Sequence, residues 1–122
     1  MNKEGLSRRM TAHYAVIQVV LNSACAVIFG YSSVYLRAQG LKVGLLRPIT
    51  VWPFPYARLR ELAEGGVKGF MAVEMSQGQM VDDVRLAVGG LKPVSFYGRC
   101  GGVVPTVSEV RLAAEKFAKE VL

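Results

Sequence analysis

The chain has 122 residues, of which 52% are hydrophobic, and a formal net charge of +6. This length suits one domain, and this composition excludes an intrinsically disordered chain, because enough apolar surface is present to form a core. The two cysteines and one histidine form no Cys-x-x-Cys or His-Glu-x-x-His motif, so Cys and His alone cannot supply a four-ligand zinc site. Because Lys and Arg do not cluster with aromatic residues, we expect a basic soluble protein that binds no nucleic acid.

The N-terminal part of the chain combines a basic start with a mostly apolar run over residues 12–29, which is the pattern of a signal peptide or a membrane span. Four polar side chains, which are costly in hydrocarbon, interrupt this run: His13, Gln18, Asn22 and Ser23. A membrane-tethered protein is therefore the lesser alternative. The half from Ala24 to Phe29 is continuously apolar, which favours an inner strand covered on both faces.

Helix-like and strand-like segments alternate along the rest of the chain. Gly40 ends a short helix expected over Tyr31 to Gln39, because glycine readily adopts the left-handed conformation that terminates helices. The last helix begins at a capping box formed by Thr106 and Glu109. Further strands are expected at 41–46, 67–75 and 94–97, and further helices from 55 to the glycines at 65–66 and from 78 to 88. This order predicts a three-layer α/β domain with helices on both faces of a mostly parallel sheet.

The segment from Arg47 to Pro55 is held extended by its prolines and carries large side chains. An arginine donor fork beside two aromatic faces has the composition of an interface hot spot. The alternative is that Trp52 plugs the core beneath a loop, and both interpretations stay open. We predict interface or loop-structuring roles, and no catalytic role, for Arg47, Pro48, Thr50, Trp52, Pro53 and Phe54.

Two other places lie where α/β proteins bind ligands, at the carboxyl ends of strands. Glu74 ends an apolar strand and Gln79 begins the next helix, and the favoured interpretation is that both satisfy loop amides and hold the turn. The loop from Gly98 to Gly102 precedes a helix whose amides could bind an anion, but Gly-Arg-Cys-Gly-Gly matches no standard phosphate-binding motif. We therefore favour a connector, and place Arg99 with the interface or loop-structuring residues.

Three motifs, in order along the chain, resemble those of the α subunits of 2-oxoacid:ferredoxin oxidoreductases. They are K-V-G-L-L-R-P-I-T-V-W-P-F-P (Lys42 to Pro55), V-E-M-S-Q-G-Q-M-V-D-D-V-R-L-A-V (Val73 to Val88) and Y-G-R-C-G-G-V-V-P-T (Tyr97 to Thr106). The third departs from the family pattern at Cys100, where the family has proline. The resemblance identifies residues 24–122 as a transketolase C-terminal-like domain and leaves residues 1–23 as an unmatched N-terminal segment.

The resemblance implies a complex that oxidatively decarboxylates a 2-oxoacid (2-oxoglutarate, pyruvate or a branched-chain 2-oxoacid) to an acyl-CoA and passes electrons to ferredoxin. Such complexes use thiamine diphosphate, magnesium and iron–sulfur clusters, and the thiamine chemistry lies in a preceding domain of the α subunit and in the β subunit. We therefore expect a cytoplasmic, non-catalytic domain that binds no cofactor itself and contacts the thiamine-binding domain or β subunit. Ferredoxin and coenzyme A would act at the level of the complex, and a homo-oligomer is a further option. The alternative is a free-standing assembly or binding module of the same fold.

Overall fold

A computed structural model describes residues 16–20, 23–50 and 52–122 of the chain. Within these residues, strands and helices alternate without exception. In chain order they are β1 (Val16–Val20), α2 (Ser23–Ala38), β2 (Val43–Leu46), α3 (Tyr56–Glu64), β3 (Gly69–Glu74), α4 (Met80–Val88), β4 (Val94–Gly98) and α5 (Val107–Val121). From β2 onward, these elements follow the predicted order.

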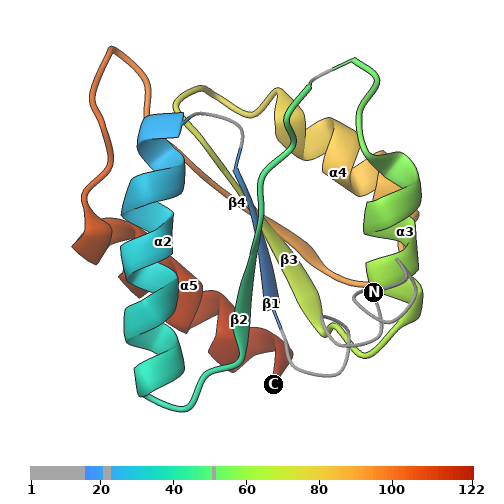
Figure 1. The fold of residues 1–122 in the computed structure, drawn as a ribbon, viewed down its shortest axis with the longest axis horizontal. Helices are drawn as coiled ribbons and strands as arrows, with labels where there is room; N and C mark the ends of the chain where they lie inside the picture. The colour runs from blue at the N-terminus through green and yellow to red at the C-terminus, as the bar shows by residue number, and fades with distance from the viewer. Residues whose placement is uncertain (1–15, 21–22, 51) are drawn as a thin grey trace.

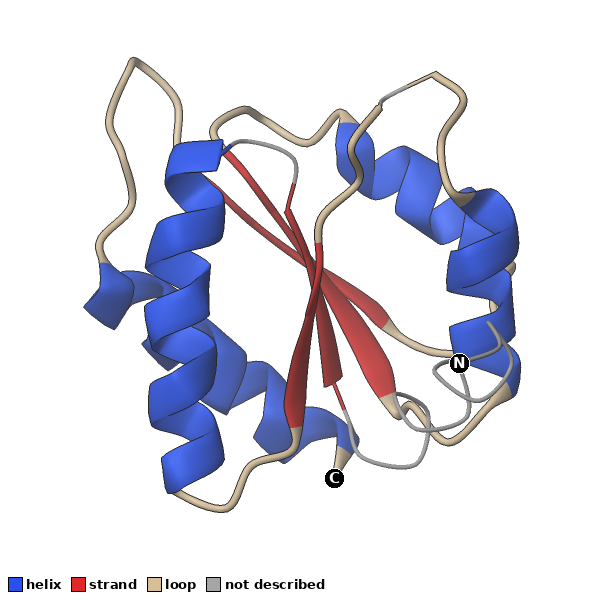
Figure 2. Ribbon diagram, viewed as in Figure 1, coloured by secondary structure: helices blue, strands red, loops and turns tan. Residues whose placement is uncertain are grey.

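The described strands form one parallel sheet in the order β2-β1-β3-β4. β1 is an inner strand, because Val16 lies opposite Val43 of β2 on one side and opposite Gly69 of β3 on the other. Figure 1 shows α2 and α5 on one face of the sheet and α3 and α4 on the other. Figure 2 shows the strands enclosed between these two helix layers. The predicted three-layer α/β architecture is therefore confirmed.

Each helix layer packs on the sheet through its own buried cluster, and β3 contributes to both. Phe70 and Ala72 belong to the cluster beneath α3 and α4, whereas Met71 and Val73 belong to the cluster beneath α2 and α5. Successive side chains of a strand point to opposite faces, so a strand covered on both faces must be apolar throughout. This explains why every residue of β3 is buried and why its sequence shows no polar alternation.

The first strand and the first helix differ from those predicted. Residues 24–29 are not a strand but lie within α2, which is also longer than the helix expected over Tyr31 to Gln39. An unbroken apolar run fits a buried helix as well as a buried strand, so hydrophobicity alone could not separate the two. The inner strand is β1, which lies N-terminal to the expected domain division at residue 24 and completes the sheet between β2 and β3. None of the helices within the described ranges is long and apolar enough to cross a membrane.

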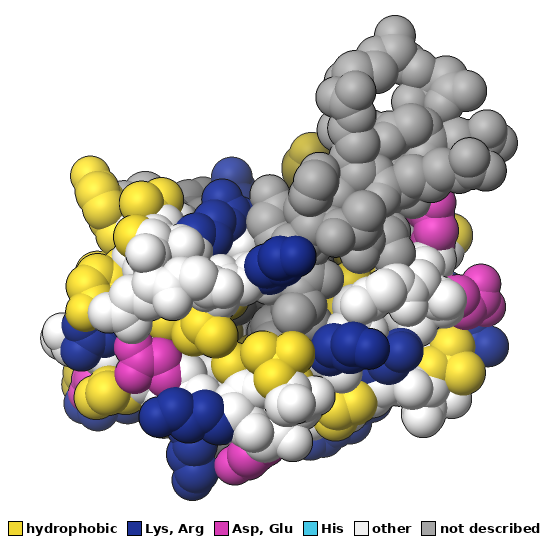
Figure 3. All heavy atoms as spheres, turned by 90° about the horizontal axis from the view of Figure 1, so that it is seen from below, with side chains coloured by type: hydrophobic (Ala, Val, Ile, Leu, Met, Phe, Trp, Pro, Cys, Tyr) yellow, Lys and Arg dark blue, Asp and Glu magenta, His cyan; other side chains and the backbone are white. Residues whose placement is uncertain are grey.

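Basic side chains are dispersed over one end of the described part of the molecule (Figure 3). Figure 3 looks at the side where the amino ends of the strands lie, and Lys and Arg alternate there with apolar and acidic side chains. Lys42, Lys68 and Lys92 each come shortly before one of the later strands. Helices of a parallel α/β fold end at this edge, and positive charge near their C-termini offsets the partial negative charge of the terminal carbonyls. These lysines thus have a structural explanation that needs no nucleic-acid partner.

Candidate functional site at the carboxyl edge of the sheet

The strand order places a topological switch point between β1 and β3. The chain leaves β1 for β2 on one side and later returns to β3 on the other side. In open α/β sheets, ligands bind outside the carboxyl ends of the strands at such a point. The connections after β2, β3 and β4 all lie at this edge, at the top of Figure 1. Glu74, the Arg47–Pro55 segment and the Gly98–Gly102 loop are therefore brought to one end of the molecule.

Glu74 occupies the N-terminus of α4 with its own carboxylate. Its Oε1 atom accepts hydrogen bonds from the backbone N–H groups of Gln79 at 3.2 Å and Met80 at 2.6 Å, and its Oε2 atom accepts one from Val81 at 3.1 Å. The Ser76 hydroxyl donates to the same Oε1 atom at 3.3 Å. A helix N-terminus of this kind is the usual anion site of an α/β fold. Here its amides are satisfied by a side chain from the preceding strand.

The turn between β3 and α4 is thus organised by Glu74 rather than by a residue at the start of the helix. The Gln79 side chain makes no capping hydrogen bond, although its backbone N–H donates to Glu74. Ser76, which sequence reasoning did not single out, also accepts a hydrogen bond from the Gly78 N–H at 3.3 Å. In the sequence, the role of Ser76 in this turn is indicated only by its position between a buried strand and a helix.

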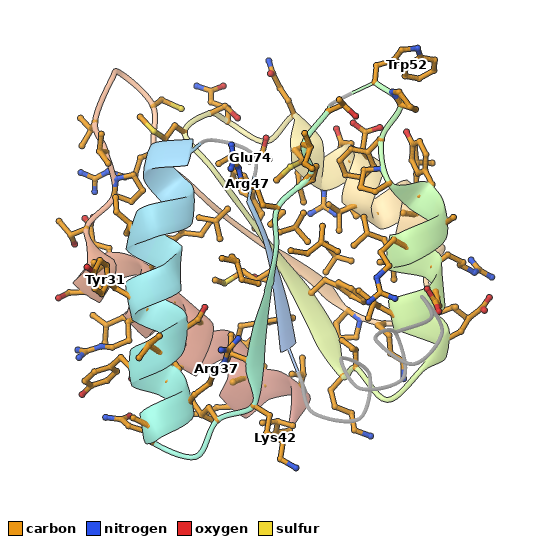
Figure 4. All side chains as sticks on the ribbon, viewed as in Figure 1. Tyr31, Arg37, Lys42, Arg47, Trp52 and Glu74 are labelled. Atoms are coloured by element: carbon orange, nitrogen blue, oxygen red, sulfur yellow. The ribbon has the colours of Figure 1, made fainter. Side chains whose placement is uncertain are left out.

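In the Arg47–Pro55 segment, the structure separates a buried anchor from an exposed tip. Phe54 is 5% exposed, belongs to the core cluster, and meets the Tyr56 ring edge-on with 5.2 Å between the ring centroids. Trp52 is 85% exposed and Ile49 is 94% exposed. Figure 4 shows the Trp52 side chain pointing away from the body of the domain. The interpretation that Trp52 plugs the core is therefore wrong, because Phe54 fills that position.

Local contacts shape the same segment. The Thr50 hydroxyl donates a hydrogen bond to the carbonyl of Pro53 at 2.9 Å, and the Trp52–Pro53 peptide bond is cis. Pro48 is buried, and beside it lies an open cavity of about 710 Å³ whose lining includes Arg47, Pro55 and Arg58. A segment held by the Thr50 hydrogen bond and by the buried Pro48 presents its exposed side chains at a low entropic cost on binding.

The loop after β4 is tied to α5 by an ion pair. Arg99 Nη1 lies 2.8 Å from Oε1 of Glu109, and Glu109 Oε2 accepts the backbone N–H of Thr106 at 2.7 Å. The Thr106 N–H is the largest cause of a lowered pKa at Glu109, and the Thr106 hydroxyl and Arg99 lower this pKa further. Thr106 Oγ1 accepts the Glu109 N–H in return, so the predicted capping box is confirmed. The Arg99 side chain of this loop is therefore already paired with a carboxylate of the same chain.

Two exposed valines in this loop were missed from the sequence. Val103 and Val104 are 45% and 46% exposed and belong to the connection that leaves the carboxyl end of β4, as Ile49 and Trp52 belong to the one that leaves β2. Apolar side chains in a loop are a signal of contact with another surface, but Val103 and Val104 also read as the continuation of an apolar segment before Pro105. Their exposure was visible only in three dimensions.

The described residues bring together no ligand set for a metal ion or an iron–sulfur cluster. Among them, no group of three or more His, Cys, Asp or Glu side chains could hold a metal ion. Cys100 is exposed on the loop after β4, Cys25 lies in α2, and His13 lies outside the described residues. Iron–sulfur clusters are held by several cysteine thiolates, which this part of the chain does not bring together.

Both the sequence and the fold of the chain resemble those of known proteins. Residues 12–110 match the family model described as pyruvate:ferredoxin oxidoreductase core domain II. The chain belongs to this family. The matched residues include β1, which lies inside the sheet.

Curated relatives of this core domain II chain are subunits that are several times longer than the chain. It is 48% identical over 84 residues to ketoisovalerate oxidoreductase subunit VorB of Methanothermobacter marburgensis, covering 69% of this chain and 23% of the relative. It is 51% identical over 81 residues to the same subunit of Methanothermobacter thermautotrophicus, covering 66% of this chain and 22% of the relative. It is 34% identical over 74 residues to 2-oxoglutarate synthase subunit KorA of M. marburgensis, covering 61% and 20%. The chain thus spans less than a quarter of the length of these relatives.

Solved structures show the same fold. A 2-oxoglutarate:ferredoxin oxidoreductase from Magnetococcus marinus, with 2-oxoglutarate, coenzyme A and succinyl-CoA bound, superposes with a TM-score of 0.73 at 24% identity, covering 87% of this chain and 18% of that one. A split-gene transketolase, solved as an inactive beta4 tetramer, superposes with a TM-score of 0.72 at 17% identity, covering 90% and 40%. At these identities the likeness shows the fold alone, and it agrees with the predicted transketolase-like α/β domain.

Proposed function

We propose that this core domain II chain is a non-catalytic docking domain of a 2-oxoacid:ferredoxin oxidoreductase α subunit. The complex would oxidatively decarboxylate a 2-oxoacid to an acyl-CoA and pass the electrons to ferredoxin. The proposal is supported by the family match and by relatives that are oxidoreductase subunits. Thiamine diphosphate, magnesium and the iron–sulfur clusters would be held by the rest of the assembly, with ferredoxin and coenzyme A acting at the level of the complex in the cytoplasm.

The observation that carries this proposal is the contrast between the two parts of the carboxyl edge. At the switch point, the helix amides that would hold an anionic ligand are bonded to Glu74. Around it, the loops raise apolar side chains into solvent, namely Ile49, Trp52, Val103 and Val104. An edge with an internally satisfied ligand position and exposed apolar tips is suited to contact a protein rather than to bind a small molecule.

These four exposed side chains, which we call the carboxyl-edge tips, mark the surface that we assign to the thiamine-binding partner. Trp52 is the strongest anchor, because tryptophan is enriched among the residues that dominate binding energy. Phe54 in the core, together with the Thr50–Pro53 hydrogen bond, holds the segment that carries Trp52. In this proposal, Arg47, Pro48, Thr50, Pro53 and Phe54 shape the segment. Glu74, which accepts the backbone N–H of Gln79, and Arg99, which pairs with Glu109, hold the neighbouring turns.

The substrate of the complex is proposed from the relatives alone. Identity to the ketoisovalerate oxidoreductase subunits is 48–51%, against 34% to the 2-oxoglutarate synthase subunit. This difference supports a branched-chain 2-oxoacid over 2-oxoglutarate. Selection between side chains of 2-oxoacids would take place in the partner, next to the thiamine.

The test is reconstitution of the chain with the thiamine-binding parts of a ketoisovalerate oxidoreductase, namely its β subunit and the rest of its α subunit. We expect a stable complex that reduces ferredoxin or a viologen dye with ketoisovalerate faster than with 2-oxoglutarate. Trp52→Ala should weaken assembly by about tenfold or more, as for a central aromatic anchor. Leu86→Ala is the matched control, since Leu86 is 72% exposed on α4. A chain that neither binds the partner nor affects its activity would overturn the docking role and favour the free-standing module.

A further inference from the structure

The outer edge of β4 has no strand beside it among the described residues. The sheet order ends at β4, and all five residues from Val94 to Gly98 are partly exposed. The other strand of this pair, β3, is buried at every position. The strand at the edge of the sheet is therefore partly open to solvent, whereas its neighbour is fully covered.

The hydrogen-bond pattern shows which main-chain groups of β4 face outward. Pro93 accepts the N–H of Phe70, and Arg99 donates its N–H to the carbonyl of Glu74. Residues of a strand alternate in the side to which their N–H and C=O groups point, so Ser95 and Tyr97 also bond towards β3. The N–H and C=O groups of Val94, Phe96 and Gly98 consequently point away from the sheet, spaced to receive another strand.

The β4 sequence lacks the usual protection of a free edge. Monomeric proteins protect edge strands with charged residues, with proline inside the strand, or with bulges. Val-Ser-Phe-Tyr-Gly contains no charge, and Pro93 lies before the strand rather than within it. Such an edge is typical of a strand that another strand covers.

A groove continues this edge onto α5. This groove has a volume of about 650 Å³ and is lined by residues of β4 and α5. Tyr97, Leu112 and Phe117 contribute apolar surface, and Leu112 is 56% exposed. Lys116 lies between two acidic side chains along the same groove, Glu109 and Glu120.

We propose that this face is the docking site of a second copy of the chain, with β4 pairing antiparallel to β4 of that copy across a two-fold axis. The two sheets would join into one, and α5 would pack against its symmetry mate. A two-fold interface needs a self-complementary surface. With Leu112 at the axis, an antiparallel repeat brings Lys116 of each copy near Glu109 of the other. The Glu109 carboxylate already pairs with Arg99 of its own chain, and Lys116 of the other copy would add a second positive charge to that pair. Leu112 of each copy would fill the apolar part of the groove.

This dimer lies on a different surface from the carboxyl-edge tips, so it does not depend on the proposed function. Sedimentation equilibrium of the full chain over a range of concentrations should show a reversible monomer–dimer equilibrium. Leu112→Glu should raise the dimer dissociation constant by about tenfold or more, because it places like charges opposite each other across the axis. Leu86→Glu on α4 is the matched control and should leave the equilibrium unchanged. A chain that stays monomeric at all concentrations, or that Leu86→Glu dissociates as strongly as Leu112→Glu, overturns the proposal.

Amide hydrogen exchange identifies the paired edge directly. As the concentration rises, exchange should slow at the outward amides of Val94, Phe96 and Gly98. The amides of Ser95 and Tyr97 face β3 and should be protected at every concentration. In Leu112→Glu the outward amides should exchange rapidly throughout. Concentration-independent exchange at the outward amides of a dimeric chain would show that the copies associate elsewhere, and would overturn the β4 assignment.

Discussion

Glu74 accepts a hydrogen bond from the backbone N–H of Met80 at 2.6 Å, so the last residue of β3 caps the first turn of α4. The cap comes from the preceding strand, and it lies at the position where related architectures place an anionic ligand. One side chain thus fixes the strand–helix angle and fills the ligand position. This relationship is the basis for treating the carboxyl edge as a contact surface.

Removal of this carboxylate should destabilise the domain. Glu74→Ala leaves buried helix amides without an acceptor, which we expect to lower the free energy of unfolding by about 3 kcal/mol. Glu74→Gln keeps one acceptor oxygen and should cost less. Urea denaturation measures both, with the exposed Glu120→Ala as control, expected within about 0.5 kcal/mol of wild type. Equal stability of Glu74→Ala and the control would mean that water replaces the carboxylate fully.

The two aromatic residues of the proline-rich segment should respond in opposite ways to truncation. Phe54→Ala opens a cavity in the core and should lower the free energy of unfolding by about 3–5 kcal/mol. Trp52→Ala removes an exposed side chain and should change it by less than about 0.5 kcal/mol. Thermal or urea unfolding of the isolated chain distinguishes them. A large loss of stability in Trp52→Ala would contradict its assignment as a contact residue.

Glu109 should make stability depend on acid pH. Its pKa is lowered, chiefly by the Thr106 N–H, so its contribution is fully present above the unfolded pKa of about 4.3 and is lost as pH falls through the lower folded pKa. Glu109→Gln should therefore flatten the stability curve in this window. A carboxyl NMR titration should still find a lowered pKa in Thr106→Ala, since the backbone donor remains. A normal pKa in that variant would assign the effect to the hydroxyl instead.

Tyr56 should titrate at unusually high pH. Its hydroxyl donates to Oδ1 of Asp83 at 2.6 Å, and this hydrogen bond is the largest cause of its raised pKa. Its contribution to stability is present below the unfolded pKa of about 10 and is lost as pH rises through the higher folded pKa. Asp83→Asn should lower the pKa of Tyr56 towards the ordinary tyrosine value of about 10, which an NMR titration measures. An identical Tyr56 titration in wild type and variant would mean that the bond does not persist in solution.

The sequence predicted those parts of the fold that have local signals. The Thr106–Glu109 capping box and the glycine that ends α2 follow from residue chemistry within one helical turn. β1 and α2 were misassigned, because both are apolar and only the pairing of β1 with β2 and β3 decides which segment is the strand. Such pairing is a tertiary property and leaves no periodic signature in the residues themselves.

The candidate site was predicted less completely than the fold. The proline-rich segment was correctly singled out, but which aromatic ring is buried depends on the direction in which the loop leaves β2, and that is set by packing on α3 and the sheet. The favoured interpretation of Glu74, that it accepts hydrogen bonds from amides of the following turn, agrees with the structure, whereas the Gln79 side chain makes no such bond. The open edge of β4 could not be inferred, because strand order must be known before any strand can be placed at an edge.

The central position of β1 determines how the chain can be shortened. β1 is the only element in the described part of the chain that joins β2 to β3, and it is contributed by residues 16–20. A chain that began at residue 24 would lack the backbone hydrogen bonds that connect β2, through β1, to β3 and β4. The side chains of Met71 and Val73 on β3 would become exposed where β1 had covered them. Such a truncation would yield two incomplete halves prone to capture a foreign strand. Residues 16–20 are therefore required for the later strands to form one sheet, because β2 and β3 pair with β1 and not with each other.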